Sequence, residues 1–178
     1  MTNNPDVKLT SPDIERDASF ALGWFSQDAG RDTLLSMGNA PHKIQESTLE
    51  SEQATLREFI DLERDGIQKT WMIRYGDVTI GATWIDLVEN HGVDAPSVHL
   101  MIGEPSFRGQ GIGGAVMRTM LNYLSESGVR TVYSRHLTSN KAVARLNQEI
   151  GFENDGEPYV DEDELEWQKI AISLPAPY

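Results

Sequence analysis

The feature that most constrains this chain is a glycine-rich segment between a predicted strand and a predicted helix. The strand covers 98–102, a largely apolar stretch bounded by Pro96 and Pro105. The glycines that follow it are Gly109, Gly111, Gly113 and Gly114. Apolar side chains then recur at three- and four-residue spacing up to Leu124, which predicts a helix that ends near Gly128.

A strand that leads through such a turn into a helix forms a potential anion site. Backbone amides in the first helical turn have no intrahelical partner, and the positive end of the helix dipole points the same way. Glycine has no Cβ atom, so a ligand can approach this backbone closely. We therefore expect a diphosphate to bind here; a tight turn that binds nothing is the structural alternative.

Two common nucleotide-binding motifs fit the segment less well. A P-loop ends in Gly-Lys-Ser/Thr, whereas here Gly113-Gly114 is followed by Ala115. The spacing of the dinucleotide fingerprint Gly-x-Gly-x-x-Gly is matched by Gly109, Gly111 and Gly114. That fingerprint also needs an acidic residue about twenty residues later. The next predicted strand carries arginines and no carboxylate, which disfavours a dinucleotide site.

The segment also fills the pattern Arg-x-x-Gly-x-Gly with Arg108, Gly111 and Gly113. This pattern resembles the coenzyme A loop of the GNAT superfamily of acyl-CoA-dependent N-acyltransferases. A second segment, from Asn140 to Phe152, is similar to another part of that family, although Val143 replaces the usual small residue. Within the superfamily, the chain looks most like ribosomal-protein N-terminal acetyltransferases and aminoglycoside N-acetyltransferases.

The resemblance implies acetyl-CoA as the co-substrate and no metal. Backbone amides around Met101 would pair with the pantetheine arm, and Asn140 would hydrogen-bond it, with helix capping as the alternative role for Asn140. The implied cofactor-binding residues are Met101, Ile102, Gly103, Arg108, Gly109, Gln110, Gly111, Ile112, Gly113, Gly114, Asn140 and Arg145.

Sequence patterns predict the element order β-α-α-β-β-β-α-β-α-β-β. The first strand is expected at 7–10, followed by a helix that Ser11 caps. The segment 28–43 contains several turn-forming residues and is expected to be irregular. A capping box that starts at Ser47 opens the second helix, which Gly66 ends.

The second half of the chain supplies the rest of the predicted sheet. Two strands joined at Gly76-Asp77 form a hairpin, which is expected to pair antiparallel with the strand before the glycine-rich segment. Later strands are expected at 131–133 and 167–174. The chain is therefore predicted to be one α/β (α+β) domain, residues 1–178, whose mixed, mostly antiparallel sheet resembles the GNAT fold.

Composition limits the partners of the chain. The formal net charge of −13 disfavours nucleic acid, because its phosphates would be repelled. The absence of cysteine excludes disulfides and thiolate chemistry. No apolar run approaches the ~20 residues of a membrane span, and residues 1–8 lack a signal-peptide core. A cytoplasmic protein without a membrane partner is expected, and a homodimer is left open.

An amine acceptor must lose a proton when it attacks a thioester. The pKa of an alkylamine is about 10.4, so deprotonation at neutral pH costs roughly 4 to 5 kcal/mol and a general base is useful. His99 is the first candidate, because it interrupts the apolar strand and imidazoles titrate near neutral pH. Asp86 and Glu89 are the reserve candidates, and a structural histidine is the alternative for His99.

The leaving group and the acceptor are less well specified. Many relatives carry a tyrosine seven residues after the asparagine to protonate the thiolate, but this chain has Asn147 there. Tyr133 or another hydroxyl is expected to substitute, or the thiolate leaves unassisted.

The acidic loop 155–164 either holds an amino-group substrate or is solvated surface. The resemblance implies a primary amine of a small molecule or a peptide N-terminus as the acceptor; the alternative is a catalytically silent acyl-CoA sensor.

Overall fold

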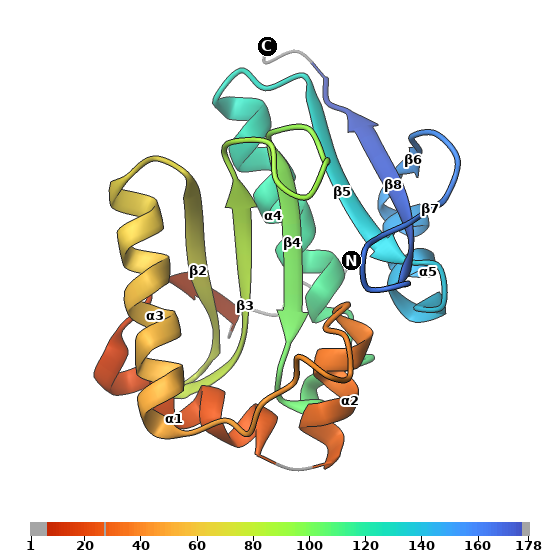
Figure 1. Ribbon diagram of the computed structural model, residues 1–178. Coiled ribbons are helices and arrows are strands. Elements are labelled where there is room, and N and C mark those ends of the chain that lie inside the picture. The colour runs from red at the N-terminus through yellow and green to blue at the C-terminus, as the bar shows by residue number, and fades with distance from the viewer. Residues whose placement is uncertain (1–6, 27, 176–178) are drawn as a thin grey trace.

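The computed structural model of this chain describes residues 7–26 and 28–175. Its strands are β1 (Val7–Thr10), β2 (Gln68–Tyr75), β3 (Val78–Asp86), β4 (Ser97–Ile102), β5 (Thr131–Leu137), β6 (Glu153–Asn154), β7 (Tyr159–Val160) and β8 (Glu166–Ser173). They form one sheet in the order β1-β2-β3-β4-β5-β8-β6, with β7 paired to β8 (Figure 1). Among the described strands, β4 and β5 are the one parallel pair, which confirms the predicted mixed, mostly antiparallel sheet.

Helices cover both faces of this sheet (Figure 1). They are α1 (Ile14–Phe25), α2 (Asp28–Ser36), α3 (Leu49–Arg64), the short 3-10 helix η1 (Pro105–Phe107), α4 (Ile112–Glu126) and α5 (Lys141–Ile150). Helix α4 packs on one face, where Val116 and Met120 join Val98 and Val132 in the larger core cluster. Helices α1 and α3 pack on the opposite face in a second cluster that includes Met101. Burial of each such aliphatic side chain contributes about 1.5–3 kcal/mol.

Helix α2 corrects one expectation, because the segment 28–43 was expected to be irregular and begins with nine helical residues. Gly30 was interpreted as a turn former, but it serves close packing between two helices. A Cβ atom at Gly30 would lie 2.4 Å from the backbone Cα of Phe25 at the end of α1. The glycine therefore lets α2 start directly against α1, a tertiary reason that local sequence does not reveal.

Two helix caps lie slightly later than expected. Helix α1 is capped by Asp13 and not by Ser11, since the Asp13 carboxylate accepts a backbone N–H of the first turn. The capping box of α3 is formed by Thr48 and Ser51, one residue after the expected start at Ser47. Neighbouring Ser, Thr and Asp residues have similar capping preference, so the backbone conformation decides between them.

The strands agree more closely with the predictions. The hairpin turns at 76–77, and β3 pairs antiparallel with β4, as expected. Strand β5 continues to Leu137, four residues beyond its predicted end, and the acidic loop contains β7. The expectation that residues 1–8 lack a signal-peptide core concerns mainly residues 1–6, which lie outside the described part of the chain. In the part of the chain that the structure describes, no helix combines the length and apolarity needed to cross a membrane.

Candidate active site

Strands β4 and β5 pair over a short length and then separate. Their one register pair joins Ser97 and Tyr133, and the N–H of Tyr133 donates to the carbonyl of Pro96 at 3.0 Å. One step further, the buried hydroxyl of Ser134 donates to the carbonyl of Val98 at 2.8 Å. Beyond this point the two strands diverge (Figure 1). One edge of β4 is therefore left without a strand partner near its carboxyl end.

Backbone polar groups of β4 alternate between its two sides. The carbonyl of Met101 faces β3, since it would lie 2.1 Å from a Cβ atom at Gly81. The carbonyls of Val98 and Ile102 accept bonds from the opposite side. By alternation, Leu100 also presents its N–H and C=O to the unpaired edge. Sequence reasoning missed Leu100, because the register of the sheet decides which residues face the gap.

The first turn of α4 has no side-chain cap. Its N-cap residue is Gly111, with φ of 78°, and none of the described side chains caps the turn with a hydrogen bond. Gly109 has φ of 73°, and a Cβ atom there would meet open space. The Gln110 side chain folds back to donate to the carbonyl of Ser106 at 2.7 Å. The amides without intrahelical acceptors are those of Ile112, Gly113 and Gly114.

Two of the four glycines lie against Leu146 of α5. A Cβ atom on Gly113 would lie 3.1 Å from Leu100 and 3.4 Å from Leu146, so this glycine lets α4 pack closely against β4 and α5. Gly114 is buried, and its Cβ atom would lie 3.6 Å from Leu146. Gly109 has the open space that close approach of a ligand needs, and Gly111 is the N-cap residue at positive φ, so ligand binding by this segment stays a prediction.

Arg108 ties the end of β4 to helix α2. Its Nε donates to the carbonyl of Ile102 at 2.9 Å, and its Nη2 donates to the carbonyl of Gly103 at 3.1 Å. The same Nη2 also donates to the hydroxyl of Thr33 at 2.8 Å. The guanidinium is therefore committed to protein partners in this structure, and its predicted contact with the cofactor stays a prediction.

Asn140 and Arg145 differ in their surroundings. Asn140 caps α5 by accepting the N–H of Val143 at 3.2 Å, and its Nδ2 donates to the carbonyl of Ser36 in α2 at 3.1 Å. Arg145 is 81% exposed and pairs with Glu149 of its own helix at 2.8 Å. Helix α2 is thus held by Asn140 and by Arg108, while Arg145 makes no such link among the described contacts.

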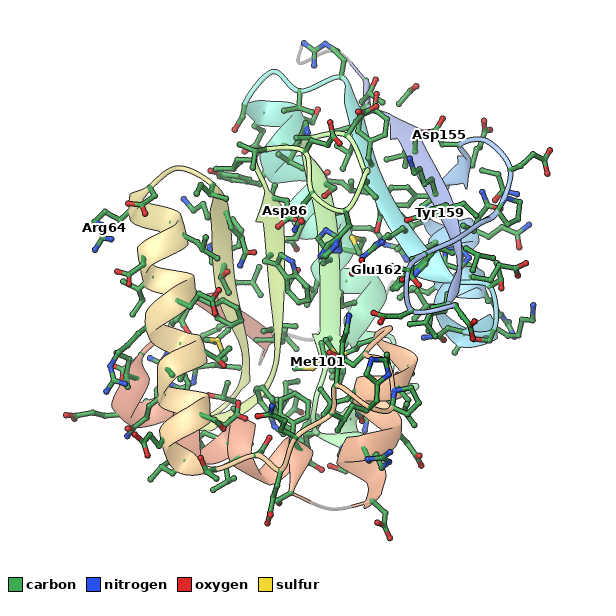
Figure 2. The ribbon with its side chains drawn as sticks, viewed as in Figure 1. Arg64, Asp86, Met101, Asp155, Tyr159 and Glu162 are labelled. Atoms are coloured by element: carbon green, nitrogen blue, oxygen red, sulfur yellow. The ribbon has the colours of Figure 1, made fainter. Side chains whose placement is uncertain are left out.

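His99 and Asp86 form a close pair in the middle of the sheet. The distance from His99 Nε2 to Asp86 Oδ2 is 3.1 Å, and the side chains are 19% and 5% exposed. The hydroxyl of Ser97 lies 3.0 Å from the same nitrogen. The imidazole stacks on Trp84 with centroids 5.1 Å apart. Figure 2 places Asp86 at the end of β3, on the face that carries α1 and α3.

Asp86 is ionised at neutral pH. Burial is the largest influence and would raise its pKa, but the hydrogen bond and charge of His99, together with Asn90 and His91, lower the pKa below its ordinary value. The amide of Asn90 adds a hydrogen bond to Oδ2 at 3.1 Å, and the charge of His91 acts in the same direction. The third predicted base, Glu89, lies exposed in the loop after β3. The structure therefore brings His99 and Asp86 together.

A family model described as an acetyltransferase (GNAT) domain matches residues 9–153 of the chain. The chain belongs to the GNAT acetyltransferase family. This match confirms the family, fold and enzyme class that the sequence patterns predicted, and enzymes of this family use acetyl-CoA as co-substrate. No protein of curated function matches the sequence.

Solved structures of several acetyltransferases share the fold of this GNAT protein. The microcin C7 self-immunity acetyltransferase MccE, in complex with acetyl-CoA and AMP, has a TM-score of 0.79 and 12% identity over 96% of this chain and 94% of its own. The ribosomal L7/L12 acetyltransferase RimL with coenzyme A has a TM-score of 0.78 and 16% identity over 97% and 96%. Spermidine N-acetyltransferase from Vibrio cholerae has a TM-score of 0.71 and 14% identity over 96% of both chains.

The position of the expected acid in this GNAT protein is occupied by a buried amide. Asn147 is 4% exposed, and its Nδ2 lies 3.4 Å from Nδ1 of His136 on β5. Burial, with the charge of Lys141, lowers the pKa of His136. Sequence reasoning missed His136, because no local pattern distinguishes it from an ordinary strand residue. Tyr133 lies half-buried in the register pair with Ser97, and its role as an acid stays a prediction.

The acidic loop of this acetyltransferase is partly used for internal contacts. Asp161 accepts the indole N–H of Trp167 at 2.8 Å and two backbone N–H groups of its own loop. Asp163 pairs at 2.7 Å with Lys43, from the segment after α2. Gly38 of the same segment lies on the Trp167 ring, since a Cβ atom there would come within 2.1 Å of it. Glu162 stays 88% exposed.

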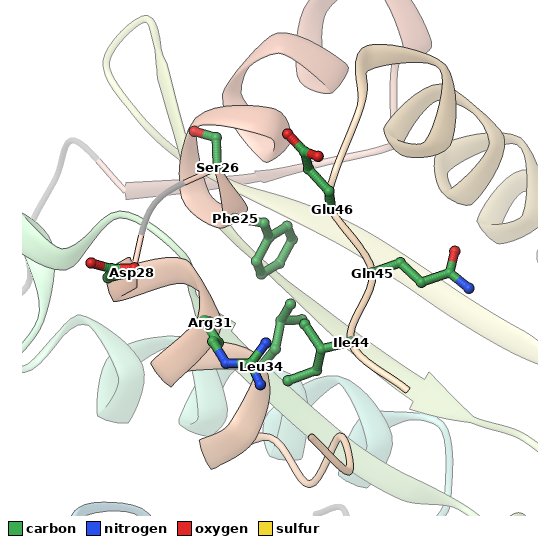
Figure 3. A pocket seen from close by; sticks show the side chains of 8 residues that line it. All are labelled: Phe25, Ser26, Asp28, Arg31, Leu34, Ile44, Gln45 and Glu46. Carbon is green, nitrogen blue, oxygen red and sulfur yellow. The ribbon is translucent and has the colours of Figure 1, made fainter. Parts of the chain in front are cut away.

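A separate hollow lies between α1, α2 and the segment before α3 (Figure 3). Its volume is about 270 Å³, and apolar side chains of Phe25, Leu34 and Ile44 gather at its centre. The polar lining residues are Ser26, Asp28, Arg31, Gln45 and Glu46. The residues that sequence analysis assigned to catalysis or cofactor binding do not line it.

Proposed function

We propose that this acetyltransferase transfers the acetyl group of acetyl-CoA directly to a primary amine of a small molecule or a peptide N-terminus. The observation that carries the proposal is the uncapped first turn of α4 beside the unpaired edge of β4. The first offers backbone amides to a diphosphate, and the second offers amide and carbonyl groups to an extended arm. The acceptors of RimL and of the spermidine enzyme, a protein amino terminus and an aliphatic amine, are both amines.

Cofactor binding is assigned mainly to backbone groups. The diphosphate binds at 109–114, and the pantetheine arm lies along the edge formed by Leu100 and Ile102. Asn140 donates to the arm through Nδ2, which here donates to Ser36. This assignment is supported by the open space at Gly109 and by the lack of a side-chain cap on α4.

His99 acts as the general base. The ionised carboxylate of Asp86 accepts the Nε2–H of His99, which leaves Nδ1 as the proton acceptor. The amine attacks the thioester carbonyl carbon, the C–N bond forms, the C–S bond breaks, and the amine proton passes to Nδ1 directly or through water. Backbone N–H groups of β4 polarise the carbonyl oxygen. The sulfur leaves as a thiolate, which a thiol pKa of about 8.5 permits without an acid.

Release of free thiol from acetyl-CoA across a panel of amines tests this function. Turnover with any amine is expected, together with heat when coenzyme A is titrated into the protein. A protein that gives no such heat contradicts the assignment of the site. Tight binding of coenzyme A without turnover favours the alternative of a silent sensor, which the buried Asn147 at the acid position supports.

Three further expectations stay predictions. They are a cytoplasmic location, the absence of nucleic-acid and membrane partners, and a homodimer as a possible assembly. Sedimentation of the purified protein measures the assembly directly.

A further inference from the structure

Two cations stand side by side on neighbouring strands. Arg135 on β5 and Lys169 on β8 are direct partners in the antiparallel register, and both side chains are half-buried. Like charges placed directly opposite in a sheet are destabilising. A chain with a net charge of −13 therefore concentrates two positive charges at one point of its sheet.

These cations share a face of the sheet with the proposed base. Ser97 and Tyr133 are register partners across β4 and β5. Two residues further along each parallel strand lie His99 and Arg135, so their side chains leave the sheet on the same face. Lys169 follows as the next residue in this row. Since β4 and β5 diverge here, the two cations lie across the opening from His99.

The cations are held by aromatic groups and not by carboxylates. The guanidinium of Arg135 stacks on Trp167 at 3.9 Å, and its Nη1 donates to the hydroxyl of Tyr159 at 3.0 Å. Lys169 Nζ lies 5.4 Å from the centre of the Tyr159 ring. Within the described residues, no carboxylate lies within 4.0 Å of a nitrogen of either side chain.

The charge of Arg135 acts on the carboxylate of Asp161, but this carboxylate accepts its hydrogen bonds from other groups. Burial raises the pKa of Asp161, but hydrogen bonds from Leu165, Trp167 and Asp163 and the charge of Arg135 lower it overall. Both oxygens of Asp161 accept hydrogen bonds from these groups. Asp161 thus fixes the loop and Trp167. Among the described residues Arg135 donates a side-chain hydrogen bond only to Tyr159, which leaves its other guanidinium N–H groups for a ligand.

We propose that Arg135 and Lys169 form a subsite for an anionic group, a carboxylate or a phosphate, on the acceptor amine. This inference rests on the proposed function and narrows its substrate class. The anionic group would lie one or two strand spacings from the amine, about 5–10 Å. A guanidinium already oriented by stacking can bind a carboxylate or phosphate in a bidentate manner at low entropic cost. A polyamine would meet two positive charges at this position and bind poorly.

Matched acceptors test the subsite. The amides of the dipeptides Ala-Asp, Ala-Asn and Ala-Lys share an amino terminus and differ in the charge of the second side chain. A second pair, 4-aminobutyl phosphate and 4-aminobutanol, distinguishes phosphate from carboxylate as the bound group. For the wild type, we expect kcat/KM to be about tenfold or more higher for an anionic acceptor than for its neutral partner.

Substitutions of Arg135 and Lys169 test whether these two residues cause the preference for an anionic acceptor. In Arg135→Gln and in Lys169→Gln, the ratio between anionic and neutral acceptors should fall towards one, and Arg135→Lys should keep part of it. Arg64→Gln is the control, since it removes the same charge from an exposed position on α3, far from β5 and β8 (Figure 2). The control should keep the ratio of the wild type.

Several outcomes overturn the inference. The first is equal kcat/KM within both pairs, that is, for Ala-Asp and Ala-Asn amides and for 4-aminobutyl phosphate and 4-aminobutanol. The second is a preference for Ala-Lys amide. The third is a ratio between anionic and neutral acceptors that is unchanged in both Gln variants. If no dipeptide is turned over, calorimetry with the N-acetylated products and coenzyme A decides, and equal affinity for the Asp and Asn forms overturns the subsite. Failure of the proposed function is distinct, because it appears as no heat with coenzyme A and no thiol release with any amine.

Discussion

Asp86 Oδ2 and His99 Nε2 lie 3.1 Å apart, although the two residues are not register partners in the sheet. Asp86 pairs with Ser97, whereas His99 pairs with Trp84, two residues before Asp86 in β3. The carboxylate therefore reaches diagonally across two strands and meets the imidazole on the face that carries α1 and α3. This geometry selects one tautomer of His99, and the first two predictions depend on it.

Replacement of the proposed base should slow the reaction without weakening cofactor binding. His99→Ala is expected to lower kcat by roughly 10²–10⁴-fold, because general-base catalysis contributes about that factor. The dissociation constant of coenzyme A, measured by calorimetry, should stay within about twofold of the wild type. A variant with unchanged kcat across a panel of amines would refute the assignment of His99 as the base.

The pair should also make stability depend on pH. The folded-state pKa of Asp86 is lowered, so the carboxylate contributes stability above the unfolded-state pKa of about 3.9 and loses it as pH falls through the folded-state pKa. The stability difference between wild type and Asp86→Asn should therefore shrink as pH falls below about 4. Urea unfolding at several pH values measures it. A difference that stays constant from pH 7 to pH 3 would show that the ionised carboxylate contributes nothing.

Two glycines in the first helices should respond oppositely to alanine. Gly30→Ala places a Cβ atom 2.4 Å from the backbone of Phe25 and should destabilise the fold by about 1–3 kcal/mol, the usual cost of overpacking. Gly23 lies inside α1, and its Cβ atom would meet nothing within 4 Å. Gly23→Ala is the matched control and should stabilise the fold by about 0.5–1 kcal/mol through helix propensity. Equal effects in chemical unfolding would argue against close contact between α1 and α2.

Substitution should separate the role of the Asn140 side-chain oxygen from the role of its side-chain nitrogen. Asn140→Ala loses both the cap of α5 and the donor to Ser36, and should cost about 1 kcal/mol of stability through the cap alone. Asn140→Asp keeps an oxygen for the cap and loses only the donor. If Nδ2 binds the cofactor, both variants should weaken coenzyme A binding. Normal binding by Asn140→Asp would restrict this residue to helix capping.

Local patterns were sufficient for much of the scaffold. The glycine-rich segment predicted the junction of β4 and α4, because positive φ angles at Gly109 and Gly111 are local backbone properties. The hairpin at 76–77 followed from its turn residues in the same way. The helical character of 28–36 was missed, because Gly30 serves a contact with Phe25 that no local pattern contains.

The candidate site likewise contains residues that the sequence could propose and residues that only the tertiary structure revealed. Residues of the glycine-rich segment could be proposed as cofactor ligands from their spacing, and His99 could be singled out as a polar residue in an apolar strand. Both roles stay predictions. The partner of His99 was only a reserve candidate, because the contact with Asp86 depends on how β3 and β4 align. Leu100 was overlooked for the same reason, since the separation of β4 from β5 decides which backbone groups lack a partner.

The sequence by itself determined most of the order of elements, with helix α2 as the exception, together with the turn that precedes α4 and membership of the acetyltransferase family, because these follow from short-range backbone preferences and motifs. Only the tertiary structure decided which distant groups meet: Arg108 with Thr33, Asn140 with Ser36, and Arg135 beside Lys169. The physical reason is that such contacts depend on strand register and helix packing, which arise from the whole core and not from any one segment.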